Sequence, residues 1–251
     1  IGTETSPTGL TVAVTYDGNA AAPTNVGSYT VIAAIDEALH SGSTTGTLSI
    51  SAVALTVTGA VGDDKAYDGT TSATITGGSL VGALGDDIVT LENATAGTFS
   101  QAGVGTELAV TSAMMLGGAD AGNYTVVQPL LFANITAQGL TVSDAVADDK
   151  PYDATDAASI TGGTLSGVVG SEDVTLENSA TGTFAQVDIG ADISVATAMS
   201  LGGTDTANYT LTQPTLSADI TTKELTVSGA EAQDKAYDGT NAATVASAVL
   251  S

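Results

Sequence analysis

Residues 63–70 read D-D-K-A-Y-D-G-T, and this stretch occurs twice more in nearly the same form. It returns as D-D-K-P-Y-D-A-T at residues 148–155 and as Q-D-K-A-Y-D-G-T at residues 233–240. The lysines Lys65, Lys150 and Lys235 are therefore separated by 85 residues each time. A fixed period of this length indicates a tandem array of similar domains.

The repeat extends well beyond this motif. Aligning residues 54–138 with 139–223 gives 45 identities in 85 positions, without an insertion or a deletion. We expect a shorter, partial β module over residues 1–52, complete repeats over 53–138 and 139–223, and the truncated start of a third repeat over 224–251. Only a few residues join consecutive units, which predicts limited bending between neighbours.

The pattern of apolar residues favours β-strands throughout. Leu140 and Val142 alternate with polar residues, as do Leu216, Ala218 and Ile220, and a period of two is typical of half-buried antiparallel strands. The 30 glycines supply turns between them. The sequence predicts an all-β fold of tandem Ig-like β-sandwich domains, each with seven or eight strands in two sheets. We expect the domains to stack end to end in an elongated rod.

The charge is strongly negative, with 28 acidic residues against four lysines and a net charge of −24. Nucleic acids and anionic membranes require a basic surface, so both are excluded as partners. No apolar run is long enough for membrane insertion, and without cysteine there is no disulfide framework. The acidic surface favours solubility and repulsion between neighbouring chains.

The K-x-Y-D-G-T motif and the G-G-x-D-x-x-N-Y-T segment resemble the YDG-type repeat domains of large secreted bacterial surface adhesins. Residues 14–50, with Y-D-G, A-P-T-N-x-G-x-Y-T-V and G-T-L-x-I, resemble the MBG-type module that accompanies them. The resemblance implies secreted, repetitive bacterial surface proteins with Ig-like β domains, and it does not imply a catalytic activity. Ala154 departs from the motif, which has glycine there, so we expect that the turn does not need a positive φ angle.

Two interpretations of the repeated lysine are open. Lys65 and Lys150 either form salt bridges with Asp68 and Asp153, or form isopeptide bonds with an asparagine. The isopeptide alternative needs a buried lysine and a nearby carboxylate. The residues best placed for it are Asn123 and Asn208, with Glu92 and Glu177 as the acids.

The motif residues are expected to serve the structure of each repeat. The tyrosines Tyr67, Tyr152 and Tyr237 are interpreted as core or corner residues, and a glycan-stacking surface is the alternative. His40 is the only histidine and lies outside the repeats, so no catalytic triad can be repeated in them. The structural motif residues are Lys65, Tyr67, Asp68, Lys150, Tyr152, Asp153, Lys235, Tyr237 and Asp238.

The acidic pairs Asp63-Asp64 and Asp148-Asp149 are candidate metal ligands, because Ca²⁺ prefers carboxylate and carbonyl oxygens. No complete calcium loop is present in the sequence, so no cofactor is established and Ca²⁺ is a candidate, with solubility as the alternative role of the acidic residues. We expect the pairs to lie near the junctions between units.

These observations predict a structural stalk or filament region of an extracellular bacterial adhesin, not an enzyme. Its expected partners are neighbouring repeats of the same chain and other copies of the protein in a fibre. The alternative is a glycan- or partner-binding module in each repeat.

Overall fold

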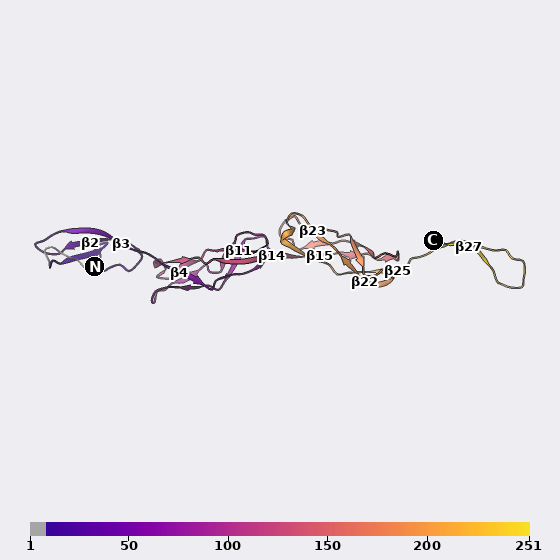
Figure 1. Ribbon diagram of the computed structural model, residues 1–251, viewed down its shortest axis with the longest axis horizontal. Helices are drawn as coiled ribbons and strands as arrows, with labels where there is room; N and C mark the ends of the chain where they lie inside the picture. The colour runs from indigo at the N-terminus through magenta and orange to yellow at the C-terminus, as the bar shows by residue number, and fades with distance from the viewer. Residues whose placement is uncertain (1–8) are drawn as a thin grey trace. The chain divides into compact units, whose positions relative to one another are not determined.

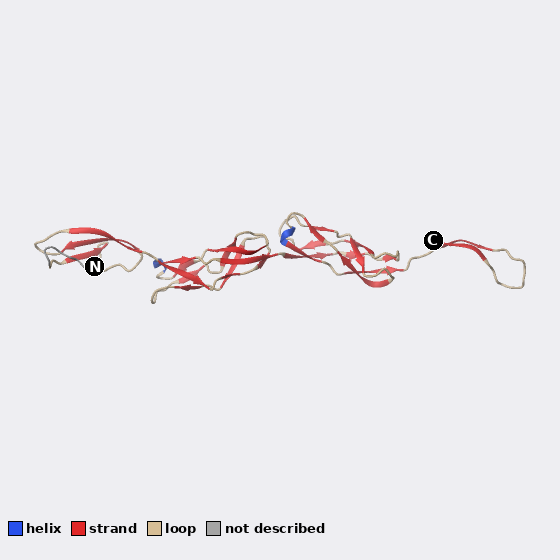
Figure 2. Cartoon of the chain, viewed as in Figure 1, coloured by secondary structure: helices blue, strands red, loops and turns tan. Residues whose placement is uncertain are grey.

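The computed structural model describes residues 9–251, and strands supply nearly all of its regular structure (Figure 1). Figure 2 shows helix only at two short turns, which are the 3-10 helices η1 (Ala121–Asn123) and η2 (Thr206–Asn208). The expected all-β class is confirmed. In the described part of the chain, no helix has the length and apolar character needed to cross a membrane. The chain divides after Thr136 into two compact units.

The N-terminal module is one antiparallel sheet of three strands, in the order β1-β2-β3. Its register places Val14 opposite Ala33 and Tyr29 opposite Leu48, which gathers apolar side chains on one face. From residue 9 to residue 50 every side chain remains at least partly exposed. The strands are β1 (Val12–Tyr16), β2 (Gly27–Ile35) and β3 (Ser43–Ile50).

The first repeat contains strands β4 to β14, more than the seven or eight expected, because glycine and aspartate turns cut the chain into short segments. The strands are β4 (Val53–Thr58), β5 (Val61–Gly62), β6 (Lys65–Ala66), β7 (Ser72–Thr76), β8 (Ser79–Val81), β9 (Thr90–Glu92), β10 (Ala96–Phe99), β11 (Gly105–Ser112), β12 (Met115–Gly117), β13 (Tyr124–Val127) and β14 (Leu131–Thr136).

These strands form three curled sheets, where the sequence predicted two. The orders are β5-β7-β10-β11-β14-β6, β13-β4-β8 and β12-β9. Two pairs are parallel, β4 with β13 and β6 with β14, which the alternation of apolar residues does not indicate. Parallel pairing arises because the first strands of the repeat lie beside its last strands, and the intervening chain returns them in the same direction.

The six-stranded sheet nearly closes on itself through residues 61–66. Gly62 in β5 pairs with β7, whereas Lys65 in β6 pairs with β14 on the opposite edge. A Cβ atom added to Gly62 would lie 3.3 Å from the Cβ of Ala133 in β14. One continuous segment therefore completes both edges of the sheet, and only residues 63 and 64 separate its two pairings.

The second repeat has the same strand order and equivalent register, as 45 identities predict. Its three sheets are β16-β18-β21-β22-β25-β17, β19-β15-β24 and β20-β23. The strands are β15 (Gln138–Ser143), β16 (Val146–Ala147), β17 (Lys150–Pro151), β18 (Ala157–Thr161), β19 (Thr164–Ser166), β20 (Thr175–Glu177), β21 (Thr181–Phe184), β22 (Gly190–Thr197), β23 (Ser200–Gly202), β24 (Tyr209–Thr212) and β25 (Leu216–Thr221).

Each complete repeat buries its own apolar core, and equivalent positions fill it. Phe99 and Phe184 are each 2% exposed, and Leu55 and Leu140 are fully buried. The alternation predicted from the sequence is present, since Ala218 and Ile220 are buried while the residues between and after them are not. Strands of period two thus supply the core of both domains.

The beginning of the third repeat forms a single hairpin of β26 (Val227–Ala232) and β27 (Val245–Leu250). Val227 pairs with Leu250, in the register that pairs Val57 with Leu80 in the first repeat. All its residues are exposed. The same local sequence therefore adopts the same pairing without the remaining strands of a repeat.

Candidate functional site

The repeated motif folds into a closed turn around the lysine. Lys65 Nζ donates hydrogen bonds to Asp68 Oδ1 at 2.7 Å, to the Thr70 carbonyl at 2.8 Å and to Thr70 Oγ1 at 3.1 Å. Asp68 Oδ1 also accepts the Thr70 N–H and hydroxyl, both at 2.9 Å. An ammonium group has three N–H donors, so the turn satisfies all of them. The salt bridge expected between Lys65 and Asp68 is present.

The second and third copies repeat these contacts. Lys150 Nζ lies 2.8 Å from Asp153 Oδ1, and Lys235 Nζ lies 3.0 Å from Asp238 Oδ1. Both lysines also bond to the threonine that ends their motif. Lys150 makes one further bond, to the Ala157 carbonyl at 3.0 Å. Because the third copy lacks most of a repeat, the turn is encoded by the motif itself.

The turn holds its carboxylate in the charged form. The Lys65 ammonium, followed by the Thr70 N–H, lowers the pKa of Asp68 from 3.8 to about 2. Lys150 and Thr155 lower the pKa of Asp153 to about 2 in the same way. The pKa of Asp238 is also lowered, first by the Thr240 N–H and then by Lys235. Hydrogen bonds to the ionised form have this effect.

An aromatic ring covers the lysine in each complete repeat. Lys65 Nζ lies 5.6 Å from the centre of the Phe99 ring, and Lys150 Nζ lies 5.5 Å from that of Phe184. These distances are typical of cation–π contacts. The lysine side chains are 18% and 15% exposed there, against 39% for Lys235. The core of a repeat thus packs onto a turn that already exists.

The three motif tyrosines differ in burial. Tyr67 is 7% exposed and belongs to the core, Tyr152 is 38% exposed, and Tyr237 in the third hairpin is 97% exposed. Of the expected core or corner roles, the burial of Tyr67 agrees with a core role, whereas Tyr152 and Tyr237 lie outside the core. Tyr152 and Tyr237 lie within the same kind of turn as Tyr67, but less of each side chain is covered.

Ala154 corrects one expectation from the sequence. Its φ angle is +65°, close to the +77° of Gly69 and the +72° of Gly239. The turn therefore does require a left-handed residue at this position, and Ala154 adopts that conformation despite its Cβ atom. The bonds from Lys150 and Thr155 to Asp153 fix the residues on either side of Ala154, and they hold the strained backbone in place.

The acidic pair of the first repeat fastens the segment that completes the six-stranded sheet. Asp63 Oδ1 accepts the hydroxyl of Thr76 in β7 at 2.8 Å. Asp64 accepts the backbone N–H of Asn134 in β14 at 2.7 Å, and the Asn134 amide bonds to both of its carboxylate oxygens. The Asn134 amide is the main cause of the lowered pKa of Asp64. Each carboxylate thus binds a different edge of the sheet.

The second repeat keeps this arrangement but changes one partner. Asp148 Oδ1 accepts the Thr161 hydroxyl at 3.2 Å, and Asp149 Oδ1 accepts the N–H of residue 219 at 2.8 Å. Residue 219 is an aspartate, where the first repeat has Asn134. The side-chain amide that donates hydrogen bonds to Asp64 therefore has no counterpart at Asp149.

Four charged residues of the second repeat line one pocket, namely Asp148, Asp149, Lys150 and Asp153. Within residues 9–251, no group of three or more acidic, histidine or cysteine side chains has the geometry to hold a metal ion. Calcium binding at the predicted pairs stays a prediction, and each of the four carboxylates already accepts a hydrogen bond on at least one oxygen.

The structure gives the candidate isopeptide residues separate partners. Lys65 bonds within its own motif, whereas Asn123 Oδ1 accepts the N–H of Val26. Lys150 likewise bonds to Asp153 and Thr155. These polar contacts are the ones that the salt-bridge interpretation predicts.

A second tyrosine, at the start of a strand, carries a hydrogen bond to an acid in each repeat. Tyr124 donates its hydroxyl proton to Asp87 and accepts the N–H of Leu84 at 3.0 Å. Tyr209 donates to Glu172 at 2.6 Å and accepts the N–H of Val169. Asp87 raises the pKa of Tyr124. Each tyrosine therefore anchors a long loop, with the acid supplying the acceptor.

Comparison with known families agrees with this geometry. The family model of the YDG domain matches residues 51–130 and 136–216, and that of the MBG domain matches residues 2–54. The chain belongs to the YDG domain family. Its two YDG matches cover β4 to β13 of the first repeat and β15 to β24 of the second, each with its lysine turn, and the MBG match contains the three-stranded sheet. No curated protein and no solved structure matches the chain.

MBG and YDG domains are structural repeat families typical of the repeat regions of surface adhesins. The lysine turn therefore belongs to a YDG domain whose repeated polar residues bond mainly to one another. This arrangement can hold a turn closed, because the lysine, aspartate and threonine of each motif bond to one another.

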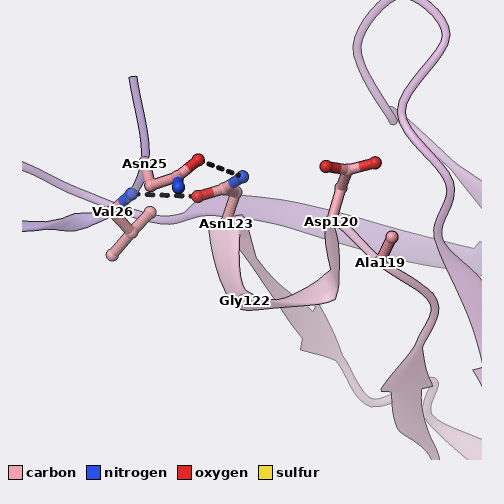
Figure 3. A pocket seen from close by; sticks show the side chains of 6 residues that line it. All are labelled: Asn25, Val26, Ala119, Asp120, Gly122 and Asn123. Carbon is pink, nitrogen blue, oxygen red and sulfur yellow. Dashed lines mark hydrogen bonds between the residues drawn. The ribbon is translucent and has the colours of Figure 1, made fainter. Parts of the chain in front are cut away.

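The MBG domain and the first YDG domain meet at a polar contact (Figure 3). Asn123 Oδ1 accepts the Val26 N–H at 2.9 Å, and its Nδ2 donates to Asn25 Oδ1 at 3.5 Å. Asn25 and Val26 precede β2, and Asn123 ends η1. Together with Ala119, Asp120 and Gly122, these residues line a small pocket.

Several residues important to the YDG domains were not identified from the sequence as contributors to the site. The threonine that ends each motif completes the lysine turn, and Phe99 or Phe184 covers it. Their signal was present in the repeat itself, because Thr70, Thr155 and Thr240 recur with the period of the lysine. The contacts of Asn134 and Asp219 have no such signal, since these two residues differ.

Proposed function

We propose that this chain is a structural repeat region of an extracellular bacterial adhesin, which projects from the cell surface or assembles there. The observation that carries the proposal is the lysine turn. At Lys65, Lys150 and Lys235, the most distinctive repeated side chain makes its hydrogen bonds mainly within its own motif. A repeated residue whose hydrogen bonds stay within its domain stabilises that domain and does not serve to bind a ligand.

The charge and the module family support the same role. A net charge of −24 opposes collapse of neighbouring domains onto each other and opposes binding to other acidic polymers. Near-identical domains in series supply length, since each copy performs the same task. We propose an end-to-end arrangement of the domains, and no enzymatic activity.

Small-angle scattering and a glycan array on the same chain test the proposal together. We expect scattering from an elongated particle and no binding of glycans at sub-millimolar concentration. A compact particle would contradict the structural role. Sub-millimolar glycan binding that is lost in a Tyr152→Ala variant would instead support a binding module in each repeat, because Tyr152 is the exposed motif tyrosine of a complete domain.

A further inference from the structure

The covalent connection between the MBG domain and the first YDG domain is very short. Strand β3 ends at Ile50 and β4 begins at Val53. Val53 pairs with Tyr124 in the parallel ladder of β4 and β13. The linker therefore delivers the chain directly beside the residue that follows Asn123.

The second connection lies on the neighbouring strand of the MBG sheet. Gly27, the first residue of β2, pairs with Ile50 at the end of β3. Val26 immediately precedes Gly27 and donates its N–H to Asn123. The sheet is therefore attached at the adjacent ends of two strands, once by the peptide chain and once by the Asn123 side chain. One attachment permits rotation about the linker, whereas two attachments oppose it.

Apolar side chains line a pocket beside both attachments. Val26 and Ile50 from the MBG domain and Val53 and Leu84 from the YDG side line a common pocket with Asn123. Val26 N–H is partly buried where it meets the asparagine. Loss of the acceptor would leave a partly desolvated N–H without a hydrogen bond, which costs free energy. The contact between Val26 and Asn123 therefore opposes separation of the two domains.

The chemistry of this position suits asparagine. The Asn123 side-chain amide offers its oxygen as acceptor for the Val26 N–H and its NH2 group as donor to the side-chain oxygen Oδ1 of Asn25. An aspartate would keep the acceptor but present a carboxylate to the Asn25 oxygen, and an alanine would provide neither group.

We propose that the Asn123 side chain locks the MBG domain onto the first YDG domain, so that the pair moves as one body. The inference rests on the proposed structural role. It makes Asn123 the residue that limits bending between the MBG domain and the first YDG domain. Asn123 is a positioning residue for the joint, and its partner is the A-P-T-N segment of the MBG domain at residues 22–25.

The absence of cysteine from the chain allows a direct test by spin labelling. Thr47→Cys in β3 and Thr98→Cys in β10 would place labels at exposed positions, one in each domain. Pulsed electron resonance on the full chain should give a narrow distance distribution. With Asn123→Ala the distribution should roughly double in width, because relative motion is the default between domains joined by a small interface. Asn123→Asp should give an intermediate width.

Asn208→Ala is the matched control, because Asn208 occupies the same motif position in the second repeat. It should leave this distribution unchanged. A broad distribution in the unmodified chain, or a narrow one in Asn123→Ala, would show that the joint does not depend on Asn123. Either result leaves the structural role standing. Glycan binding by the repeats would contradict that role and leave the distance measurement unaffected.

Discussion

Asp149 accepts the backbone N–H of Asp219 at 2.8 Å, which brings a second aspartate to a carboxylate that fastens the edge of the sheet. In the first repeat, the equivalent Asp64 meets Asn134, whose amide donates to both carboxylate oxygens. The two repeats therefore differ in charge at the same structural contact, and they provide a natural comparison within one chain.

Asp219→Asn should stabilise the second repeat, because an amide donor would replace a like charge beside Asp149. We expect its melting temperature to rise by a few degrees at neutral pH and low salt. The reciprocal change, Asn134→Asp, should lower that of the first repeat. The melting temperatures of the two variants should shift in opposite directions. Shifts of the same sign would show that residues 134 and 219 act through something other than this contact.

Ala154 and Gly69 supply a second matched pair. Ala154→Gly should stabilise the second repeat by about 1 kcal/mol, because glycine adopts the left-handed conformation without the Cβ conflict. Gly69→Ala should destabilise the first repeat by about 1 kcal/mol for the same reason. Chemical denaturation of the two variants measures both values. If Ala154→Gly had no effect, the φ angle of +65° would carry no strain.

Lys150→Met tests the lysine turn. The variant keeps the apolar stem over Phe184 but removes an ammonium that bonds to Asp153, Thr155 and Ala157. We expect a loss of about 2 kcal/mol, more than an exposed ion pair contributes. Lys223→Met, at an exposed position outside the motif, is the control and should be nearly neutral.

The intact mass of the protein distinguishes the two interpretations of the lysine. A salt bridge leaves the mass equal to that of the sequence, whereas each isopeptide bond releases one ammonia. We expect no loss of mass. A deficit that disappears in Lys150→Met would establish the covalent bond in place of the ion pair.

Acid should weaken the motif turn, and the direction follows from the lowered pKa of Asp153. Folding favours the charged form, so the contribution is complete above the ordinary pKa of 3.8 and fades as the pH falls towards about 2. Asp153→Asn should therefore be less stable than the unmodified protein at pH 5, and the difference should shrink between pH 4 and pH 2. Melting curves across this range give the comparison; a constant difference would mean that the charge of Asp153 is unimportant.

Calcium binding at Asp63-Asp64 and Asp148-Asp149 predicts a specific response to the ion. Millimolar Ca²⁺ should raise the melting temperature more than NaCl of equal ionic strength, because binding to the folded state stabilises it by mass action. Asp148→Asn combined with Asp149→Asn should reduce the excess, because only the Asp63-Asp64 pair would remain. If both salts raised the melting temperature equally, Ca²⁺ would act only by screening charge, and the acidic residues would act only through the hydrogen bonds that they accept.

The sequence contained the domain period and the local turn because both depend on residues close in the chain. The spacing of Lys65 and Asp68 predicts their ion pair, and the alternation at Leu216, Ala218 and Ile220 predicts the buried face of the last strand. Equal register in the two repeats follows from their identities. These features need no knowledge of distant contacts.

The sheet pairing could not be predicted in the same way. Val53 and Tyr124 lie far apart in sequence, and period two in both segments fits parallel and antiparallel partners equally well. The hydrogen bond that the Val26 N–H donates to Asn123 joins two different domains. Neither segment alone therefore contains a signal for it. The φ angle of Ala154 was misjudged because its residue type was considered without the Asp153 contacts that constrain it.

The local nature of the lysine turn has a consequence for biosynthesis. Consecutive copies with 45 identities in 85 positions offer each strand an incorrect partner in the neighbouring copy. The contacts from Lys65 to Thr70, however, span only five residues. Each copy can close its turn as soon as these residues leave the ribosome, before the matching strands of the next copy have been synthesised. We expect this order of synthesis to favour pairing of each domain with its own strands over exchange between adjacent copies.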